Sequence, residues 1–245
     1  RIYSKLFFKI SLKGLNYKSR NFEKNGELYV LKYIQEKFGN EAALTIFDVG
    51  GNVGNYSKSL SIFFNDKATI HSFEPSKKTY QIFLETTKNI QNIIPNNFGL
   101  SNHVQNQLLY TNCDGSGLAS MYQRNLDHIG ISMEKSEEIA LSTIDNYCEA
   151  NNLQRIHFLK LDIEGHELKA LNGAKKMMDE KKIDFIQFEF GGCNIDSRTY
   201  FQDFYLLLKD NYKIYRILRN GLFEISKYKE TYEIFTTINY LAIRK

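Results

Sequence analysis

The sequence lacks the features that define several common protein classes. Its three cysteines are odd in number and form no Cys-x-x-Cys pair, so neither a disulfide framework nor a zinc site is predicted. It has no tryptophan, and its 18 Phe and 16 Tyr stand mostly in periodic segments that predict core positions. No apolar run approaches the roughly 20 residues of a transmembrane helix, and the start has no signal-peptide pattern. We therefore expect a reducing, cytoplasmic location.

Charge is nearly balanced, with 32 basic and 28 acidic residues and a formal net charge of +4. The basic residues form no continuous block, so a nucleic-acid partner is not expected. Within residues 1–20, apolar residues mix with Lys5, Lys9, Lys13 and Lys18 as in a basic amphipathic segment. This segment is expected either to pack against the domain or to make weak contact with a membrane surface. Nothing in the sequence indicates an oligomeric state.

A chain of 245 residues with 42% hydrophobic content can bury one substantial core. We predict a helical extension over residues 1–40, with a helix from Gly26 to Phe38, and one domain over residues 41–245. Short apolar runs then alternate with helical segments, which predicts a mostly parallel sheet. The predicted strands are Leu44–Val49, Thr69–Phe73, Ile93–Phe98, Ile156–Leu161, Ile183–Phe190, Lys213–Leu218 and Tyr232–Ile243, with Gly221 in a hairpin turn. The predicted helices are Tyr56–Phe64, Ser76–Asn89, Thr143–Ala150, Glu167–Asp179 and Thr199–Asp210.

A polar stretch from Asn102 to Glu138 interrupts this alternation. It contains the turn-forming run Asp114-Gly115-Ser116-Gly117 and is predicted to be an insertion with a hairpin and a mobile loop. It follows the third predicted strand, so it would lie where a lid can cover a substrate. We predict that this insertion shapes the acceptor site.

The first predicted strand ends in Asp48 and leads into a loop rich in glycine. Gly50, Gly51 and Gly54 precede a helix, and glycine permits a positive φ and close approach of a ligand to the backbone. Asp48 is predicted to accept a hydrogen bond from a cationic amine, while loop amides at the helix start bind a carboxylate. Cofactor contacts are expected from Gly50, Asn52 and Gly54. The alternative is a glycine-rich turn without a ligand.

Glu74 ends the second predicted strand and precedes Pro75. Its two carboxylate oxygens suit the two hydroxyls of a ribose. The alternative is a helix-start carboxylate, because proline is favoured at the first helical position. Asn52 replaces the second glycine of the G-x-G-x-x-G pattern, which weakens the case for NAD. A sulfonium cofactor with an amino acid tail explains Asp48 better, so S-adenosylmethionine is predicted.

Ser101 and Asn102 follow the third predicted strand. By sheet order this turn lies beside the adenine of such a cofactor. Either side chain can hydrogen-bond the base, and either is equally common as a turn former. Both interpretations stay open at this point.

A second group of polar residues follows the fourth predicted strand, at the edge where open α/β sheets bind ligands. Asp162 is predicted to hold substrate, a cofactor amine or a divalent ion. His166, with an ordinary pKa near neutrality, suits removal of a hydroxyl proton. It is alternatively a surface histidine, with Glu164 as the rival base. Glu167 is expected to interact with its own helix dipole. Glu189 ends the fifth predicted strand and either lines the acceptor pocket or pairs with a cation.

Together these motifs resemble the FkbM family of methyltransferases. The resemblance runs from Leu44 to Glu189 and rests on the Asp48 loop, on Leu141–Asp145 and on Asp162-x-Glu164-Gly165-x-Glu167. It implies a class I methyltransferase Rossmann-like α/β fold, with a mostly parallel seven-stranded sheet and helices on both faces. It also implies S-adenosylmethionine as cofactor and methylation of a hydroxyl on a sugar, a glycan or a related small molecule.

Three alternatives stand beside this hypothesis. They are an N-methyltransferase acting on an amine or peptide, a non-catalytic module that binds an adenosine cofactor, and an NAD-dependent oxidoreductase. Cofactor type separates the oxidoreductase from the others, and turnover separates an enzyme from a binding module. No metal-ligand set is predicted, and a requirement for a divalent ion stays open.

Overall fold

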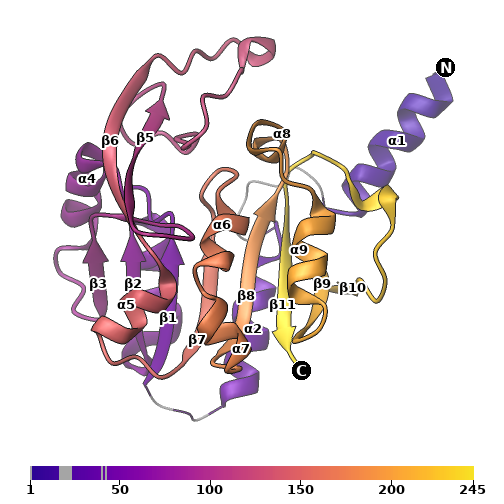
Figure 1. The fold of residues 1–245 in the computed structure, drawn as a ribbon. Helices are drawn as coiled ribbons and strands as arrows, with labels where there is room; N and C mark the ends of the chain where they lie inside the picture. The colour runs from indigo at the N-terminus through magenta and orange to yellow at the C-terminus, as the bar shows by residue number, and fades with distance from the viewer. Residues whose placement is uncertain (1, 17–23, 40, 42) are drawn as a thin grey trace.

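The computed structural model describes residues 2–16, 24–39, 41 and 43–245, built around an eight-stranded sheet (Figure 1). The strand order is β10-β9-β11-β8-β7-β1-β2-β3. The strands are β1 Leu44–Val49, β2 Ala68–Phe73, β3 Ile93–Asn96, β7 Ile156–Leu161, β8 Ile183–Phe190, β9 Tyr212–Leu218, β10 Gly221–Glu224 and β11 Ile238–Arg244. Neighbours among β1, β2, β3, β7 and β8 pair in parallel, while β11 is antiparallel to β8 and β9. The predicted mostly parallel α/β sheet is confirmed.

Helices cover both faces of the sheet, because parallel strands need crossover connections. The helices are α1 Ile2–Gly14, α2 Glu27–Phe38, α3 Asn55–Phe64, α4 Lys77–Thr87, α5 Ile144–Ala150, α6 Glu167–Asn172, α7 Lys175–Asp179, α8 Cys193–Ser197 and α9 Phe201–Leu208. Three 3₁₀ turns complete the described elements: η1 Asn65–Lys67, η2 Asp127–Ile129 and η3 Glu230–Tyr232. One core cluster contains Leu31 and Phe83, from α2 and α4. The other contains Tyr147, Leu171 and Phe204, from α5, α6 and α9.

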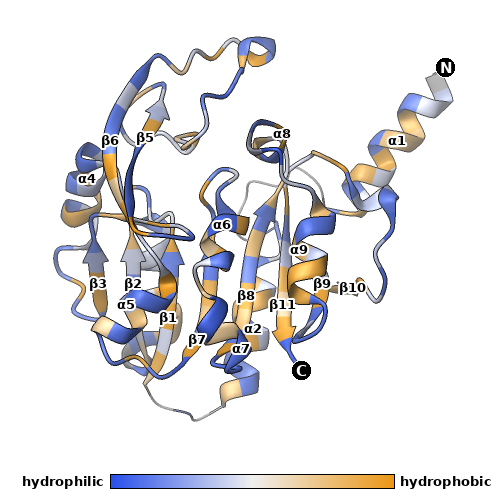
Figure 2. Ribbon diagram, in the orientation of Figure 1, coloured by the Kyte–Doolittle hydropathy of each residue, from blue (hydrophilic) through white to orange (hydrophobic). Residues whose placement is uncertain are grey.

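Apolar residues concentrate in the middle of the sheet, as Figure 2 shows for β1, β8 and β11. All six residues of β7 are buried, as expected for a strand with helices on both faces. One of these six is Lys160, a charged residue in an otherwise largely apolar strand. A buried charge requires partners, and those of Lys160 belong to the site described below.

The predicted insertion forms a second, three-stranded sheet in the order β4-β6-β5. Its strands are β4 Gly99–Leu100, β5 Gln105–Thr111 and β6 Lys135–Ser142. A small core of Leu109, Met121, Ile139 and Leu141 holds this sheet together. In Figure 1 the sheet and the long loop between β5 and β6 stand over the carboxyl ends of β1, β2 and β3. The expected hairpin is thus present, and the mobility of its loop stays a prediction.

Two predicted elements near the insertion had wrong bounds. The third strand ends at Asn96, not Phe98, because the chain then leaves the main sheet and pairs with β6. The predicted helix Glu167–Asp179 is divided into α6 and α7 at Gly173. A Cβ on Gly173 would lie 2.0 Å from the backbone oxygen of Ser101. Close approach of the β4 loop therefore accounts for glycine at the break.

The carboxyl-terminal strands also differ from the prediction. Gly221 begins an eighth strand, β10, which is antiparallel to β9 at the edge of the sheet. The last strand begins at Ile238 and not at Tyr232, which lies in η3. The predicted seven strands are present, and β10 is added to them.

The amino-terminal part has two described helices. The predicted helix from Gly26 to Phe38 is confirmed as α2, and its Val30, Leu31 and Ile34 pack in the core. Helix α1 covers much of the predicted basic segment, and residues 17–20 of that segment lie outside the described residues. The domain boundary near residue 40 stays a prediction. No helix in the described part of the chain combines the length and apolar character needed to cross a bilayer.

Candidate active site

A pocket lies at the carboxyl ends of β1, β2 and β7, beneath the second sheet. Its wall combines polar and apolar residues from several loops. The lining residues are Val49, Gly50, Asn52, Phe73, Glu74, Pro75, Gly99, Leu100, Leu109, Ser116, Gly117, Ala119, Met121, Asp162 and Ile163. Four of the eight predicted cofactor residues therefore line one pocket: Gly50, Asn52, Glu74 and Pro75. Asp162, predicted as a catalytic residue, lines it as well.

The loop after β1 has the close backbone approach that the glycines predict. Gly50 and Gly54 have φ angles of 92° and 88°, and a Cβ on Gly50 would lie 2.0 Å from the backbone oxygen of Asp162. The side-chain nitrogen of Asn52 donates to the carbonyl of Ser116 at 3.1 Å. The side-chain oxygen of Asn52 is buried and has no hydrogen-bond partner among the described residues. A buried acceptor of this kind in a pocket wall suits a ligand that carries a donor.

Glu74 is held by two backbone amides at the edge of the pocket. Its oxygens accept hydrogen bonds from Asn52 N at 3.0 Å and from Ser76 N at 2.9 Å. Burial raises the pKa of Glu74 from 4.5 to about 7, and the two amide hydrogen bonds oppose this shift. Pro75 lines the pocket, and α4 begins at Lys77 after the N-cap Ser76. The alternative interpretation of Pro75 as the first helical residue is therefore wrong.

Asp48 lies behind the loop and does not line the pocket. It is fully buried, and one oxygen accepts a hydrogen bond from Ser57 Oγ at 2.5 Å. The other oxygen has no hydrogen-bond partner among the described residues. This placement does not support the predicted direct contact with a cofactor amine. Gly54 is likewise absent from the pocket wall, and it precedes α3 as its N-cap.

Asp162 lines the pocket, and its carboxylate is held by the buried side chain of Lys160. Lys160 Nζ donates to Asp162 Oδ2 at 3.0 Å and lies 4.4 Å from the ring centre of Tyr56. Burial by itself lowers the pKa of Lys160, but Asp162, Glu27 and Asp48 together raise it above its ordinary value. Lys160 therefore stays charged. Its hydrogen bond orients the Asp162 carboxylate, whose side chain is 39% exposed toward the pocket.

Sequence reasoning missed this buried network and its link to α2. Glu27, at the first turn of α2, accepts a hydrogen bond from Gln187 Nε2 at 3.0 Å. Burial raises the pKa of Glu27, and Lys160 opposes that shift. The sequence feature that could have predicted the network is Lys160, a charged residue inside the apolar run of β7. A buried lysine needs carboxylate partners from elsewhere in the chain.

Ser101 and Asn102 lie away from the pocket. The Ser101 hydroxyl bonds to Asn102 Oδ1 at 3.1 Å and to His166 Nε2 at 2.9 Å. The Ser101 amide donates to the carbonyl of Ser142 at 2.8 Å, which turns the chain toward β6. The predicted contact of these residues with adenine is therefore not supported. Leu100, just before them, supplies an apolar contact in the pocket wall.

His166 is buried, so its interpretation as a surface histidine is wrong. Its Nε2 bonds to Ser101 Oγ, and its Nδ1 lies 3.1 Å from the hydroxyl of Tyr122. Burial lowers the pKa of His166 to about 4. The ring is therefore neutral near pH 7 and both its nitrogens are engaged. This geometry favours a role in holding the insertion against α6 over the predicted role as base.

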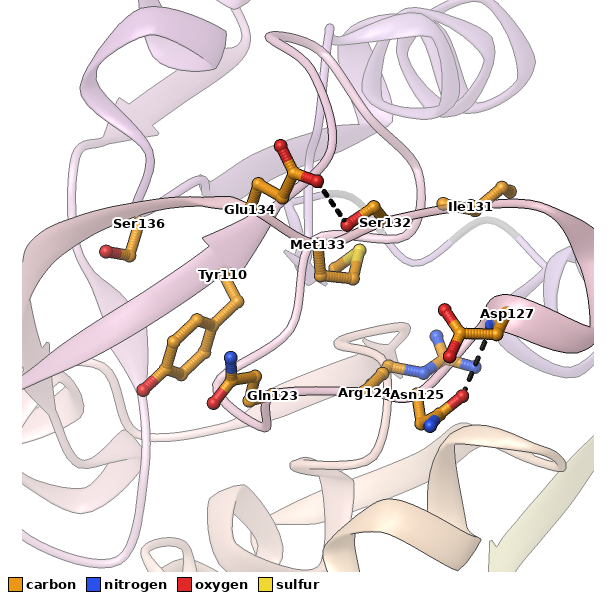
Figure 3. Close-up of a pocket in the computed structure, with 10 residues that line it drawn as sticks. All are labelled: Tyr110, Gln123, Arg124, Asn125, Asp127, Ile131, Ser132, Met133, Glu134 and Ser136. Carbon is orange, nitrogen blue, oxygen red and sulfur yellow. Dashed lines mark hydrogen bonds between the residues drawn. The ribbon is translucent and has the colours of Figure 1, made fainter.

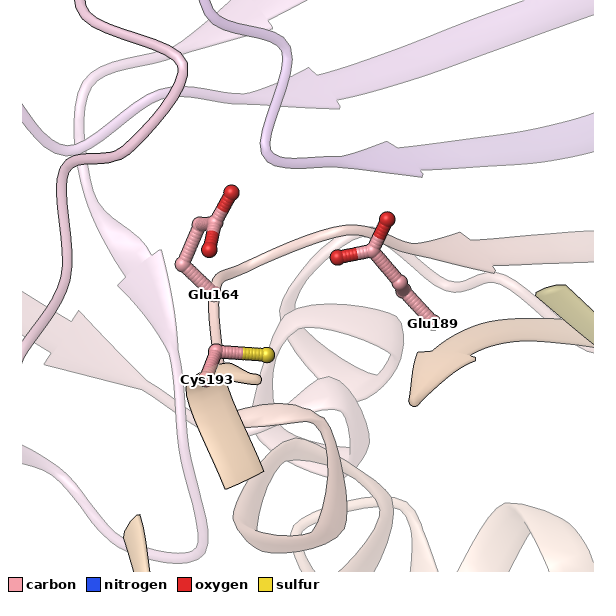
Figure 4. A group of neighbouring side chains, drawn as sticks. All are labelled: Glu164, Glu189 and Cys193. Carbon is pink, nitrogen blue, oxygen red and sulfur yellow. The ribbon is translucent and has the colours of Figure 1, made fainter. Parts of the chain in front are cut away.

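Three side chains at the ends of β7, β8 and α8 point toward one another in Figure 4. The potential ligand atoms of Glu164, Glu189 and Cys193 lie within 4.8 Å of one another. Burial raises the pKa of Cys193 well above its ordinary value. Burial, and then Asp162 and Glu164, raise the pKa of Glu189 well above its own. Glu164 and Glu189 offer hard oxygen ligands and Cys193 offers a soft sulfur, so the cluster mixes ligand types.

Arg124 connects the insertion to this cluster. Its Nη1 lies 2.5 Å from Glu164 Oε2 and its Nε lies 3.3 Å from Asp196 Oδ2, and the Arg124 side chain is only 8% exposed. Ser120 Oγ adds a hydrogen bond of 2.8 Å to the Glu164 carbonyl. The loop between β5 and β6 is thereby fastened over the ends of β7 and α8.

A larger cavity of about 600 Å³ lies within the insertion, and Figure 3 shows its residues. It adjoins the carboxylate cluster through Arg124, which lines the cavity and binds Glu164. The wall consists mainly of amide, hydroxyl and charged side chains. Its residues are Tyr110, Gln123, Arg124, Asn125, Asp127, Ile131, Ser132, Met133, Glu134 and Ser136. Such a wall suits a ligand with several hydroxyl groups.

Comparisons with known proteins show the family to which the chain belongs. The sequence model described as "Methyltransferase FkbM domain" matches residues 48–220. Hexuronic acid methyltransferase AglP of Haloferax volcanii is 26% identical over 167 residues, which are 68% of this chain. The match spans 64% of that relative, so about a third of the relative's length has no counterpart in the match.

Solved structures with a similar arrangement are more distant. The Methanococcus jannaschii fibrillarin pre-rRNA processing protein has a TM-score of 0.48 at 12% identity, covering 91% of this chain and 76% of that one. The SAM dependent methyltransferase of Agrobacterium tumefaciens has a TM-score of 0.47 at 8% identity, covering 90% and 62%. These values carry no information about the acceptor.

Proposed function

The chain belongs to the FkbM methyltransferase family; we propose that it is an S-adenosylmethionine-dependent methyltransferase whose acceptor is a hydroxyl group of a sugar. The observation that carries this proposal is the cavity of about 600 Å³ beside the carboxylate cluster. Its size suits a small sugar, and its amide and hydroxyl side chains suit a ligand with many hydroxyls. The name of the relative from Haloferax volcanii, a hexuronic acid methyltransferase, supports the same class of acceptor.

The residues of the smaller pocket fit the cofactor. Glu74 would accept hydrogen bonds from the ribose hydroxyls, and Asp162 with the unpartnered oxygen of Asn52 would receive the amine. Leu100 and Met121 would contact the adenine. S-adenosylmethionine supplies a methyl group that its positive sulfur already activates. The chain must therefore chiefly hold the acceptor oxygen in line with that methyl group.

Glu189 is the proposed base for the hydroxyl proton. Asp162 already pairs with Lys160, and Glu164 already pairs with Arg124. Burial instead raises the pKa of Glu189 well above its ordinary value, which makes its carboxylate a stronger base. In this scheme the acceptor oxygen gains the methyl group and gives its proton to Glu189. Glu164 and Asp162 then have positioning roles.

The charges of the larger cavity favour a neutral sugar over a hexuronic acid. Its cation, Arg124, is already paired with Glu164 and Asp196. Asp127 and Glu134 add two more carboxylates to the wall. A ligand carboxylate would meet these negative charges without a cation to pair with, and like charges repel. We therefore propose a neutral sugar, in contrast to the acceptor named for the relative.

The same negative charges favour a second candidate function, N-methylation of an amine. An ammonium group would be attracted by Asp127 and Glu134. Before it could attack the methyl group, it would have to lose a proton, and Glu189, whose pKa is raised, is again the proposed base. The atom that receives the methyl group separates the two candidates.

The test supplies S-adenosylmethionine with a ¹³C-labelled methyl group and three acceptors: a methyl glucoside, its uronic acid and its 2-amino analogue. Product NMR identifies the methylated atom. The proposal expects an O-methyl product from the neutral sugar, faster than from the uronic acid. Label on nitrogen only would support the second candidate. Cofactor binding without turnover on any hydroxylated or amine acceptor would support a binding module instead.

A further inference from the structure

Helix α1 exposes an unusual number of large apolar side chains. Tyr3, Leu6, Phe7, Phe8 and Ile10 are 76%, 51%, 65%, 60% and 56% exposed. Other exposed large apolar residues in the described chain are scattered along the sequence, whereas these five fall within eight consecutive positions. Figures 1 and 2 show α1 projecting from the body of the molecule with hydrophobic colour along it. Concentrated exposed apolar surface usually marks an interaction site.

Four of the five exposed apolar residues of α1 lie on one side of the helix, and the lysines form a separate row. At about 100° per residue, Tyr3, Leu6, Phe7 and Ile10 fall within a stripe of about 100°. Three lysines spaced four residues apart form a row beside that stripe: Lys5, Lys9 and Lys13. The helix has no acidic residue. Among the described residues of this segment, Leu12 and Leu15 pack against the main core.

The positive charge of the protein is concentrated in the same segment. Residues 1–24 contain seven basic residues and one acidic residue, a net charge of +6. Residues 25–245 contain 25 basic and 27 acidic residues, a net charge of −2. The segment that exposes apolar side chains is therefore also the segment that attracts anions.

We propose that α1 binds in the plane of an anionic lipid surface. Its apolar stripe would enter the boundary between headgroups and acyl chains, and its lysines would lie at the lipid phosphates. Its 13 residues span about 20 Å, less than the roughly 30 Å hydrocarbon core, so the helix lies on the bilayer and does not cross it. In Figure 1, α1 extends toward the same end of the molecule as α8, which borders the candidate active site.

Two other occupants fit the helix less well. A nucleic acid would pair with the lysines but would leave the apolar stripe of Leu6, Phe7 and Ile10 in water. A second copy of α1 would cover that stripe but would bring two rows of lysines of the same charge together. A lipid surface satisfies both sides of the helix at once.

The experiment is sedimentation of the whole chain with vesicles. One preparation is phosphatidylcholine alone, and the other contains about one third phosphatidylglycerol. The proposal expects binding at least about tenfold stronger to the anionic vesicles, and weaker binding as salt screens the lysines. Equal binding to the two preparations, or binding to neither, would overturn it.

Matched variants locate the contact. Phe7→Ser with Ile10→Ser should reduce binding to the anionic vesicles at least about tenfold, because the apolar stripe is lost. Ile62→Ser on α3, where the side chain is 72% exposed, is the control and should keep wild-type binding. Substituting glutamine for Lys5, Lys9 and Lys13 should remove the preference for anionic lipid. The same substitution at Lys175, Lys176 and Lys209 is the charge control and should keep that preference.

Three outcomes of the variant series count against a lipid partner. The first is an equal loss of vesicle binding in the Ile62→Ser control. The second is a change of oligomeric state in the α1 variants while the wild type binds no vesicles. The third is binding of the wild type to a duplex oligonucleotide but not to vesicles. The proposal does not rest on the identity of the acceptor. Circular dichroism checks that each variant keeps the wild-type fold.

Discussion

Replacement of Glu74 by glutamine should make the free protein more stable at high pH while weakening cofactor binding. Burial raises the pKa of Glu74 from 4.5 to about 7. Each unit of pKa corresponds to about 1.4 kcal/mol, so the buried ionised form costs about 3 kcal/mol of folding free energy. Below about pH 4.5 the carboxyl is protonated in both states and this cost is absent. It grows as the pH rises from 4.5, and it is fully present above about pH 7.

Glutamine keeps the shape of the neutral acid but cannot accept both existing hydrogen bonds. Its single oxygen can serve Asn52 N or Ser76 N, so one hydrogen bond worth about 1 kcal/mol is lost at every pH. The variant should therefore be about 1 kcal/mol less stable than wild type near pH 4.5 and about 2 kcal/mol more stable near pH 8. Urea denaturation at both pH values measures this difference.

At pH 8 the Glu74→Gln variant should be more stable than the wild type but should bind the cofactor more weakly. Loss of a charged hydrogen-bond acceptor for the ribose should weaken S-adenosylmethionine binding by about 1.5 to 3 kcal/mol, which titration calorimetry measures. Glu138→Gln, at an exposed position of β6, is the control and should change neither quantity. A stability difference that is the same at both pH values, or unchanged affinity in the Glu74 variant, would refute the reasoning.

Four further substitutions test other parts of the site. Gly50→Ala should abolish cofactor binding in calorimetry, because its Cβ would lie 2.0 Å from a backbone oxygen, whereas Gly221→Ala, with no atom within 4 Å of its added Cβ, should bind normally. Lys160→Met should lower the free energy of unfolding by about 3 to 5 kcal/mol in urea titrations, because it leaves buried carboxylates unpaired. In limited proteolysis, the loop between β5 and β6 should be cleaved faster in Arg124→Gln than in the wild type under the same conditions, since the variant loses both ion pairs. Glu189→Gln should lower kcat by about 10² to 10⁴ with nearly unchanged cofactor affinity. In the wild type, kcat/KM should rise with pH as Glu189 loses its proton. Full activity in the Glu189→Gln variant would show that Glu189 is not the base.

Much of the main sheet could be predicted from local pattern. The bounds of β1, β7 and β8 match the apolar runs, because strands covered on both faces are apolar at most of their positions. The second sheet was harder to see. In β5 the more buried positions alternate with more exposed ones, and this weaker pattern was hidden within polar sequence.

The depth of each polar residue could not be predicted. Asp48 and Asp162 both follow buried strands, yet Asp48 lies behind the loop and Asp162 lines the pocket. His166 is separated by 65 positions from its hydrogen-bond partner Ser101, so its burial depends on how the β4 loop packs. Sequence spacing fixes which end of the sheet a residue occupies. Long-range packing decides whether the side chain meets a ligand or another side chain.

A crystal structure with S-adenosylhomocysteine and a methyl glucoside tests the proposed site most directly. The account predicts that both ribose hydroxyls bond to Glu74 and that the sugar occupies the cavity beside Arg124. One sugar hydroxyl should then lie within hydrogen-bond distance of Glu189. A ribose far from Glu74, or a sugar outside the cavity with no hydroxyl near Glu189, would contradict the account.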